Sequence, residues 1–111
     1  MGVEVGAKEE IPVAYDLSVV KSLEDLSGMF QHWATLKGEH PDKILLYRVG
    51  DFYECYFGDA VTLANVCNFA VTSKLCGTKV GYKAAMSGLP MHSVEKHIPK
   101  LLQEGYVVAV V

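Results

Sequence analysis

The segment Lys43–Val49 constrains the fold of this chain more than any other. Its run Ile44-Leu45-Leu46-Tyr47 is apolar at consecutive positions, so both faces of an extended strand would carry apolar side chains. Such a strand is stable only when both of its faces are covered, and helices on the two sides of a sheet provide that cover. The segment therefore predicts a strand inside a layered arrangement of helices and sheet.

Helix and strand patterns alternate around this strand. The expected order is helix, strand, strand, helix, strand, strand, helix, strand. The other predicted strands are Phe52–Phe57, Phe69–Lys74, Tyr82–Ser87 and Tyr106–Val111. The first helix carries the apolar stripe Leu23, Leu26, Phe30 and Trp33, and the second carries Ala60, Leu63, Ala64 and Cys67. This order predicts the α/β (α+β) class, with a mixed β-sheet of about five to six strands flanked by about three helices.

Short polar residues mark the expected helix starts. Ser22 can cap the first helix, with Asp25 at the capping-box position in place of glutamate. Asp59 and Ser93 can cap the second and third helices in the same way. Pro99 lies inside the third helix, where proline costs roughly 3 kcal/mol. We therefore expect that helix either to kink or to restart at the proline.

A length of 111 residues suits one domain. We expect residues 1–20 to be a leader that is poorly ordered or a short extension, because they are mixed in charge and interrupted by Pro12. Residues 21–111 would then form the folded domain. No apolar run approaches the roughly 20 residues of a membrane helix, and the N-terminus lacks the pattern of a signal peptide. These features predict a cytoplasmic protein without a membrane partner, monomeric as an isolated domain.

The cysteines and the missing motifs argue against a metal or catalytic centre. Cys55, Cys67 and Cys76 are odd in number and form no C-x-x-C pair, so we expect buried, reduced thiols. A zinc site that uses His40 or His92 is the alternative. The sequence contains no phosphate-binding loop, no G-x-G-x-x-G, no paired-histidine metal motif and no nucleophile elbow. We predict no catalytic residue, no metal and no cofactor.

The charge distribution limits how strongly this chain could bind nucleic acid. The formal net charge is −3, and Arg48 is the only arginine. Residues 1–25 hold six acids and two lysines, whereas residues 26–111 hold seven acids and eight bases. Phosphate contacts supply most of the non-specific affinity for DNA. The nearly neutral body therefore predicts weak DNA binding by this domain alone.

The segment Arg48–Glu54 carries the pattern that is most informative about function. Gly50-Asp51 is a plausible tight turn, and a strand after it places Phe52 and Glu54 on one face, about 7 Å apart. The strand would place Phe52, Glu54 and Tyr56 on one face and Tyr53, Cys55 and Phe57 on the other. An exposed apolar wedge can enter a duplex step from the minor groove, and a carboxylate beside it can accept a hydrogen bond from a base. The alternative is that Phe52 belongs to the core and Glu54 is an ordinary exposed strand residue.

The stretch from about Leu26 to Val111, roughly three-quarters of the chain, resembles the N-terminal mismatch-recognition domain (domain I) of the MutS family of DNA mismatch repair proteins. Two motifs carry most of this resemblance: Gly50-Asp51-Phe52-Tyr53-Glu54, and the Met-x-Gly-x-Pro-x-His pattern that begins at Met86. The other matching pieces, in the order of the family, are Met29-Phe30-Gln31, Leu36-Lys37, His40-Pro41, Leu45-Leu46-Tyr47-Arg48, Asp59-Ala60, Val71-Thr72-Ser73-Lys74, Leu101 and Gly105-Tyr106-Val107-Val108-Ala109.

The resemblance implies a role for each of five residues. Phe52 would stack on a mispaired base, and Glu54 would form a hydrogen bond with that base. Lys74 matches a basic residue that faces the DNA backbone, and Val49 and Met86 would line the minor groove beside the wedge. The implied partners are mismatched double-stranded DNA and the remaining MutS domains or another repair protein, with the protein associated with the nucleoid. The ATPase, clamp and dimer interface of the family belong to later domains, so ATP binding is expected only of a longer parent protein.

Some residues depart from the pattern of the family. Met91 stands where tyrosine or phenylalanine is common, Ala85 occupies a proline-like position, and both Pro99 and the loop Cys76–Lys83 are unusual. Two other functions stay open on the sequence. One is a protein-interaction module that keeps the fold without recognising DNA, which the acidic leader favours. The other is a small nuclease or nucleotide-binding enzyme, against which the missing motifs argue.

Overall fold

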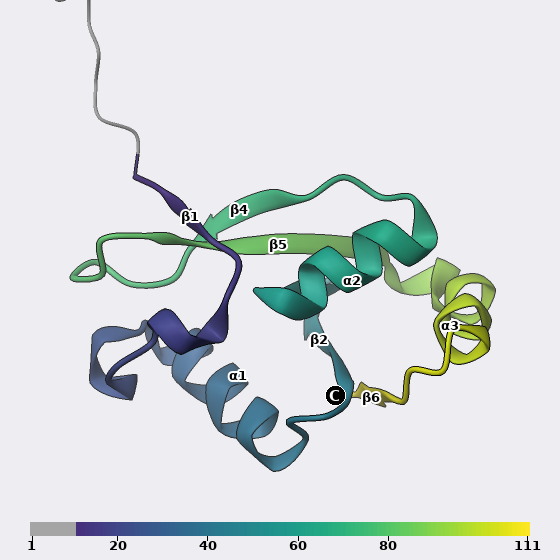
Figure 1. The fold of residues 1–111 in the computed structure, drawn as a ribbon, viewed down its shortest axis with the longest axis horizontal. Helices are drawn as coiled ribbons and strands as arrows, with labels where there is room; N and C mark the ends of the chain where they lie inside the picture. Colours follow the sequence, from purple (N-terminus) through teal and green to yellow (C-terminus); the bar gives the residue numbers. More distant parts are fainter. Residues whose placement is uncertain (1–10) are drawn as a thin grey trace, which may run out of the picture.

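A six-stranded mixed sheet forms the centre of the computed structural model, which describes residues 11–111 (Figure 1). The strands are β1 (Val13–Ala14), β2 (Ile44–Val49), β3 (Phe52–Tyr56), β4 (Thr72–Leu75), β5 (Lys83–Pro90) and β6 (Val108–Val110). The α-helices are α1 (Gly28–Glu39), α2 (Gly58–Cys67) and α3 (Val94–Gln103). Three short 3₁₀ helices complete the described elements: η1 (Leu17–Val19), η2 (Leu23–Asp25) and η3 (Met91–Ser93).

The sheet mixes parallel and antiparallel pairs. Its strand order is β1-β5-β3-β2-β6, and β4 also pairs with β5. The pairs β2–β3, β3–β5 and β4–β5 are antiparallel, whereas β1–β5 and β2–β6 are parallel. Figure 1 shows β4 and β5 as a long ribbon along one side of the molecule, with α1 and α3 toward opposite ends. The predicted fold class is therefore confirmed.

The two faces of the sheet carry separate cores, as the apolar run of β2 requires. Leu45 and Tyr47 contribute to the core beneath α1, together with Phe30 and Trp33 of that helix. Ile44 contributes to the core beneath α2 and α3. Successive residues of a strand point to opposite faces, so the consecutive apolar positions of β2 supply both cores. The strand is buried on both faces, as predicted.

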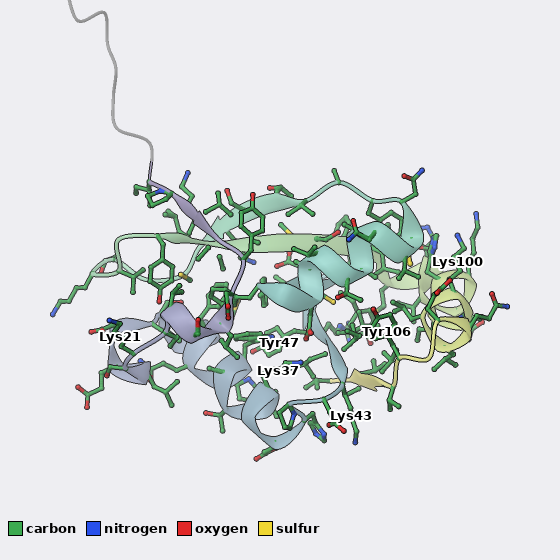
Figure 2. All side chains as sticks on the ribbon, viewed as in Figure 1. Lys21, Lys37, Lys43, Tyr47, Lys100 and Tyr106 are labelled. Atoms are coloured by element: carbon green, nitrogen blue, oxygen red, sulfur yellow. The ribbon has the colours of Figure 1, made fainter. Side chains whose placement is uncertain are left out.

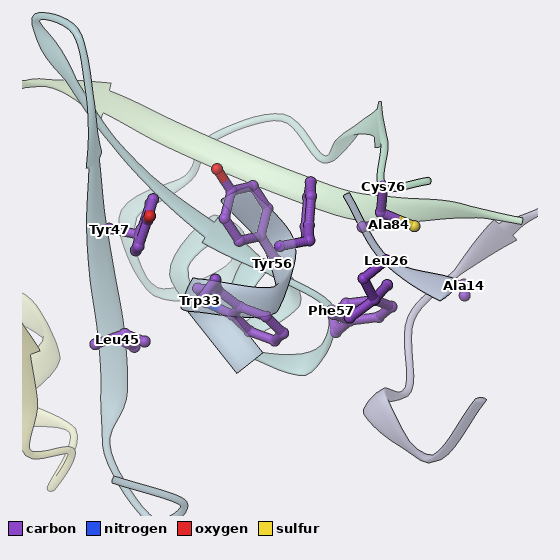
Figure 3. Packing of buried hydrophobic residues seen from close by; sticks show 10 residues of the cluster. Ala14, Leu26, Trp33, Leu45, Tyr47, Tyr56, Phe57, Cys76 and Ala84 are labelled. Carbon is purple, nitrogen blue, oxygen red and sulfur yellow. The ribbon is translucent and has the colours of Figure 1, made fainter. Parts of the chain in front are cut away.

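The core beneath α1 is aromatic. Trp33 has no exposed surface, and its ring lies 5.5 Å from that of Tyr56 and 5.4 Å from that of Phe57 between centroids. The ring of Phe30 lies 4.6 Å from that of Tyr56. Figure 3 shows Trp33 packed between Tyr47, Tyr56 and Phe57. Buried aromatic rings of this size contribute much of the stability of a small domain.

The first helix begins later than its capping pattern predicted. Ser22 precedes only the 3₁₀ helix η2, in which Asp25 is the last residue, and its side chain makes no capping hydrogen bond. The α-helix starts at Gly28, after Ser27. Leu26 is buried in the core beneath α1, and the amide of Ser27 donates to the carbonyl of Cys76 at 2.9 Å. These distant contacts hold residues 26 and 27 in an extended conformation, which a local capping pattern cannot reveal.

Asp59 does not cap the second helix, contrary to the sequence prediction. The helix starts at Gly58, and the Asp59 carboxylate lies buried, 2.9 Å from the Lys37 ammonium. It also accepts a hydrogen bond from the amide of Leu45 at 3.2 Å. Burial raises the pKa of the Asp59 carboxyl, although Lys37 and the Leu45 amide act in the opposite direction. The Asp59 side chain therefore links α1, β2 and α2 instead of capping the start of a helix.

Other predicted boundaries shift by a few residues. The strand β3 ends at Tyr56, and Phe57 has a positive φ of 57° and joins the core beneath α1, not the face of Tyr53 and Cys55. Ser93 occupies the N-cap position of α3 as predicted, but its side chain makes no capping hydrogen bond, because the hydroxyl donates to the carbonyl of Pro90. The remaining predicted strands correspond to β4, β5 and β6, each with different ends. The helix α3 runs unbroken through Pro99, so it does not restart there.

The predicted leader, residues 1–20, lies partly outside the described residues. Residues 1–10 are not described. Within 11–20, the strand β1 pairs with Lys83 and Ala84, the first two residues of β5. Cys55, Cys67 and Cys76 are buried free thiols, as predicted, and burial raises the pKa of each. Within residues 11–111, no group of three or more metal-ligating side chains comes together, and no helix is long and apolar enough to cross a membrane.

Candidate nucleic-acid interface

The tip of the β2–β3 hairpin presents Phe52 to solvent. The chain reverses at Gly50, whose φ of 59° is readily adopted only by glycine, and Asp51 completes the turn. Phe52 opens β3 and is 48% exposed, while Tyr53 packs toward the core beneath α2 and α3. The expectation that Phe52 is exposed beside a short turn is confirmed. An aromatic side chain at a hairpin tip can reach another molecule without any rearrangement of the fold.

The strand register places the five residues singled out by the sequence on one face of the sheet. Directly opposed residues of antiparallel strands point to the same side. Phe52 opposes Val49 of β2, and Met86 opposes both Tyr56 of β3 and Thr72 of β4. The remaining members follow by alternation: Glu54 shares the face of Phe52 and Tyr56, and Lys74 shares the face of Thr72. We call this side the α1 face, because α1 covers the part of it around Tyr56.

Glu54 is held by two donors that meet at one of its oxygens. The Lys74 ammonium lies 2.8 Å from Oε1, and the Tyr56 hydroxyl donates to the same atom at 2.6 Å. The side chain of Glu54 is 13% exposed and that of Lys74 is 30% exposed. The Lys74 nitrogen also lies 5.9 Å from the centre of the Tyr56 ring. The carboxylate is therefore a fixed group at the floor of the face, not a side chain that projects beside Phe52.

The Tyr56 hydroxyl remains a donor at every ordinary pH. Burial raises the pKa of Tyr56 far above the usual value, and the hydrogen bond and negative charge of Glu54 raise it further. Lys74 donates to the same oxygen, so Oε1 accepts both of these hydrogen bonds, and an ionised carboxylate has no hydrogen to donate. A molecule that approaches the carboxylate must therefore offer an N–H or O–H group.

A shallow concavity of about 430 Å³ lies beside Phe52. Its lining residues are Phe52, Glu54, Phe69, Ala70, Thr72, Met86 and Gly88. The structure thus brings Phe52, Glu54 and Met86 together around one hollow. Val49 lies next to Phe52 in the hairpin and packs against the core beneath α1. Lys74 reaches the site through its contact with Glu54.

Gly88 keeps this hollow open. It opposes Glu54 in the β3–β5 pair, so a side chain at this position would rise from the floor of the α1 face. A Cβ atom there would lie 2.9 Å from the carbonyl oxygen of Tyr53 and 3.3 Å from Cγ of Glu54. The first contact is closer than van der Waals packing allows, and its partner is backbone. Only glycine fits at position 88 without displacing β3.

We expect Gly88→Ala to destabilise the domain by about 1–3 kcal/mol, because the added methyl forces β3 and β5 apart. Chemical denaturation would measure the change. Gly38→Ala is the matched control: a Cβ at this helical position meets nothing within 4 Å. It should be neutral, or stabilising by up to about 1 kcal/mol, because alanine favours helix more than glycine does. Equal stability of Gly88→Ala and wild type would contradict the close approach at Gly88.

Two residues of this site were missed by the sequence reasoning. Tyr56 was assigned only to a strand face, and Gly88 only to a motif. The i, i+2 spacing of Glu54 and Tyr56 was visible, and it allows side chains on one strand face to meet. The contact between Lys74 and Glu54 joins residues that are 20 positions apart, and no local pattern predicted it.

Comparison with known proteins identifies relatives of this chain. Residues 27–111 match the family MutS domain I. A DNA mismatch repair protein MutS of Prochlorococcus marinus (strain NATL2A) is 41% identical over 88 residues, which cover 79% of this chain and 9% of the relative. The protein of the same name from Synechococcus sp. (strain WH7803) is 44% identical over 84 residues, 76% of this chain and 9% of the relative.

A third relative extends the match toward the N-terminus. The DNA mismatch repair protein MutS of Synechococcus elongatus (strain ATCC 33912 / PCC 7942 / FACHB-805) is 38% identical over 104 residues, which cover 94% of this chain and 12% of the relative. The chain therefore spans about a tenth of the length of the curated relatives that it matches. The family match covers most of the chain, including the whole β2–β3 hairpin and every strand of the α1 face described above. This chain belongs to the MutS domain I family.

Proposed function

We propose that this chain recognises mismatched double-stranded DNA, as the mismatch-recognition domain of a DNA mismatch repair protein. The observation that carries the proposal is the exposed Phe52 at a hairpin tip, which lines the same hollow as a Glu54 carboxylate held by Tyr56 and Lys74. Relatives named DNA mismatch repair protein MutS support the repair process. The arrangement suits a wedge that enters the minor groove while the carboxylate meets a base edge.

In this proposal, selectivity arises from the deformability of the DNA. A mispaired step stacks poorly, so unstacking and kinking it costs less free energy than at a paired step. Phe52 replaces the lost base stacking with its own ring, and Met86 and Val49 contact the groove on either side. Such a wedge needs a rigid support, and a strand that is continuous with a buried core provides one.

Glu54 would select bases by accepting a hydrogen bond. A carboxylate near the duplex repels phosphates, so it is useful only where a base N–H meets it. Lys74 lies where it offsets that negative charge, and it could also contact the backbone of a bound duplex. Glu54→Ala should therefore lower selectivity while leaving overall affinity unchanged or higher, since the substitution removes repulsion as well as a base contact.

The proposed role is non-enzymatic. The domain would supply recognition, while the other activities of the process would belong to the remaining MutS domains or to another repair protein. The relatives are about eight to nine times as long as this chain, which leaves room for such domains in proteins of this family. A protein with this role would act where chromosomal DNA lies, at the nucleoid.

A direct titration tests the proposed function. The 111-residue chain would be titrated with a duplex that contains one G·T mispair and with the matched duplex of otherwise identical sequence. NMR chemical shifts suit this measurement because they report millimolar binding. We expect tighter binding of the mispaired duplex, with the largest shifts at Phe52 and its neighbours. Equal affinity for the two duplexes, or shifts confined to another face, would contradict the proposal.

We also expect the affinity to depend only weakly on salt. The slope of log K against log salt is about −0.9 for each phosphate neutralised. At the site, Lys74 already pairs with Glu54, and Lys37 pairs with Asp59 elsewhere. Figure 2 shows Lys21 and Lys100 toward opposite ends of the molecule, with Lys37 and Lys43 between them. Titrations at several salt concentrations should therefore give a slope no steeper than about −2, and a much steeper slope would reveal a basic surface in the chain.

A second function is favoured by the apolar edge of the sheet. Leu102, Tyr106, Val107 and Val110 are each at least 39% exposed around β6, near the C-terminus (Figures 1 and 2). An exposed apolar patch on a small domain often marks a protein interface. A protein-interaction module would bind a protein tightly at this edge and show no preference for mispaired DNA, so the titration above separates the two functions.

A further inference from the structure

Two donors share a single oxygen of Glu54, and this arrangement fixes how the carboxylate can meet a base. The Tyr56 hydroxyl and the Lys74 ammonium both bond Oε1, at 2.6 Å and 2.8 Å. No donor from residues 11–111 bonds Oε2. Among those residues, Trp33 Nε1 is the only side-chain polar atom that is buried without a partner. Oε2 therefore keeps access to solvent, on the face where the concavity lies.

Tyr56 is well placed to hold the carboxylate in one orientation. Its ring is fixed in the core beneath α1, 4.6 Å from Phe30 and 5.5 Å from Trp33 between centroids. The residue is 1% exposed, so its hydroxyl has little freedom to move away from Glu54. Lys74, in contrast, is a flexible side chain on the outer strand β4, and alone it would let the carboxylate turn. The rigid partner is therefore the tyrosine.

We propose that Tyr56 is a positioning residue for DNA recognition: its hydroxyl, together with Lys74, occupies Oε1 so that Glu54 presents Oε2 alone to a mispaired base. The inference rests on the proposed function. Without the hydroxyl, the carboxylate can rotate and offer either oxygen, and a base N–H meets a less ordered acceptor. Tyr56 therefore determines specificity without touching the DNA.

The test is a double-mutant cycle that uses the 111-residue chain. The ratio of affinities for the G·T duplex and for the matched duplex is measured for wild type, Tyr56→Phe, Glu54→Ala and the double variant. Tyr56→Phe retains the ring and removes only the hydroxyl. We expect it to lower the ratio on the order of fivefold, the factor that corresponds to one hydrogen bond of about 1 kcal/mol. In the Glu54→Ala background, the same substitution should leave the ratio unchanged.

Tyr47→Phe is the matched control. Tyr47 lies on the same face, and its hydroxyl lies 2.7 Å from His32 Nδ1 rather than from Glu54. Removing this hydroxyl should leave the ratio unchanged. Lys74→Met is a second comparison: it leaves the Tyr56 hydroxyl on Oε1, so it should lower the ratio less than Tyr56→Phe does, and an equal or larger loss would contradict the role given to Tyr56.

The outcomes separate this inference from the proposed function. An unchanged ratio in Tyr56→Phe overturns the inference, and so does a loss that persists in the Glu54→Ala background, because that loss would come from packing alone. If wild type shows no preference for the mispair, the proposed function fails and the inference fails with it. A wild-type preference that Tyr56→Phe leaves intact refutes only the inference.

Discussion

Replacing Phe52 with alanine should remove most of the preference for mispaired DNA. Stacking of a base on an aromatic ring contributes roughly 1–3 kcal/mol, which corresponds to about one to two decades of affinity. The ring is already exposed at the hairpin tip, so its loss should affect binding far more than folding. Parallel titrations of the mispaired and matched duplexes should show the first affinity falling toward the second. The stability of the variant, measured by denaturation, should stay within about 0.5 kcal/mol of wild type.

Tyr106→Ala is the control for this experiment. Tyr106 is an exposed aromatic residue near β6, where Figure 2 labels it, and it does not line the hollow beside Phe52. Its removal should leave the preference unchanged. If Phe52→Ala instead retains the full preference, the wedge assignment is wrong and the protein-interaction module becomes the better account of this chain.

Trp33→Ala should cost about 3–5 kcal/mol of folding free energy. The ring is fully buried between α1 and the sheet, and its removal leaves a large cavity among Phe30, Tyr56 and Phe57. Domains of this size are stable by only about 5–15 kcal/mol, so the variant should be partly unfolded at moderate temperature. Urea titration followed by circular dichroism would measure the loss.

Two further variants show whether the lost packing is the cause. Trp33→Phe should cost much less, because it keeps a ring and removes the indole N–H, which has no partner among residues 11–111. Leu23→Ala should be nearly neutral, because Leu23 is 47% exposed even though the sequence pattern placed it on the buried stripe. A large effect of Leu23→Ala would show that the first helix does extend back to Ser22.

The sequence predicted the elements of the fold better than their ends. The apolar run of β2 and the alternation in β3 are local patterns, and both gave the correct strand and the correct exposure of Phe52. The start of α1 was wrong because Leu26 is buried and the Ser27 amide bonds the loop after β4. A capping pattern reports only what the neighbouring residues would do in the absence of such contacts.

In the candidate site, too, local patterns were predicted correctly and contacts between distant residues were not. The spacing of Phe52 and Glu54 along one strand is a local property and placed them on one face, while the resemblance to the MutS family singled them out as the recognition pair. The partners of Glu54 could not be found in that way, because Lys74 comes from another strand and the burial of Tyr56 depends on the packing of α1. The sequence therefore predicted an acidic group that projects from the surface. The structure has a carboxylate held by two donors, which is a different chemical group from a freely solvated one.

Exposure falls along β3, from 48% at Phe52 to 0% at Cys55 and 1% at Tyr56. The same five-residue strand therefore begins at the exposed hairpin tip and ends in the aromatic core. The proposed function would then link stability to recognition, because a substitution at Tyr56 that improves packing also moves the carboxylate proposed to meet the base. Under that proposal, variants selected only for thermal stability would also change in their preference among mispairs. Thr62, which lies on α2 and makes no contact with Glu54, could vary without that effect.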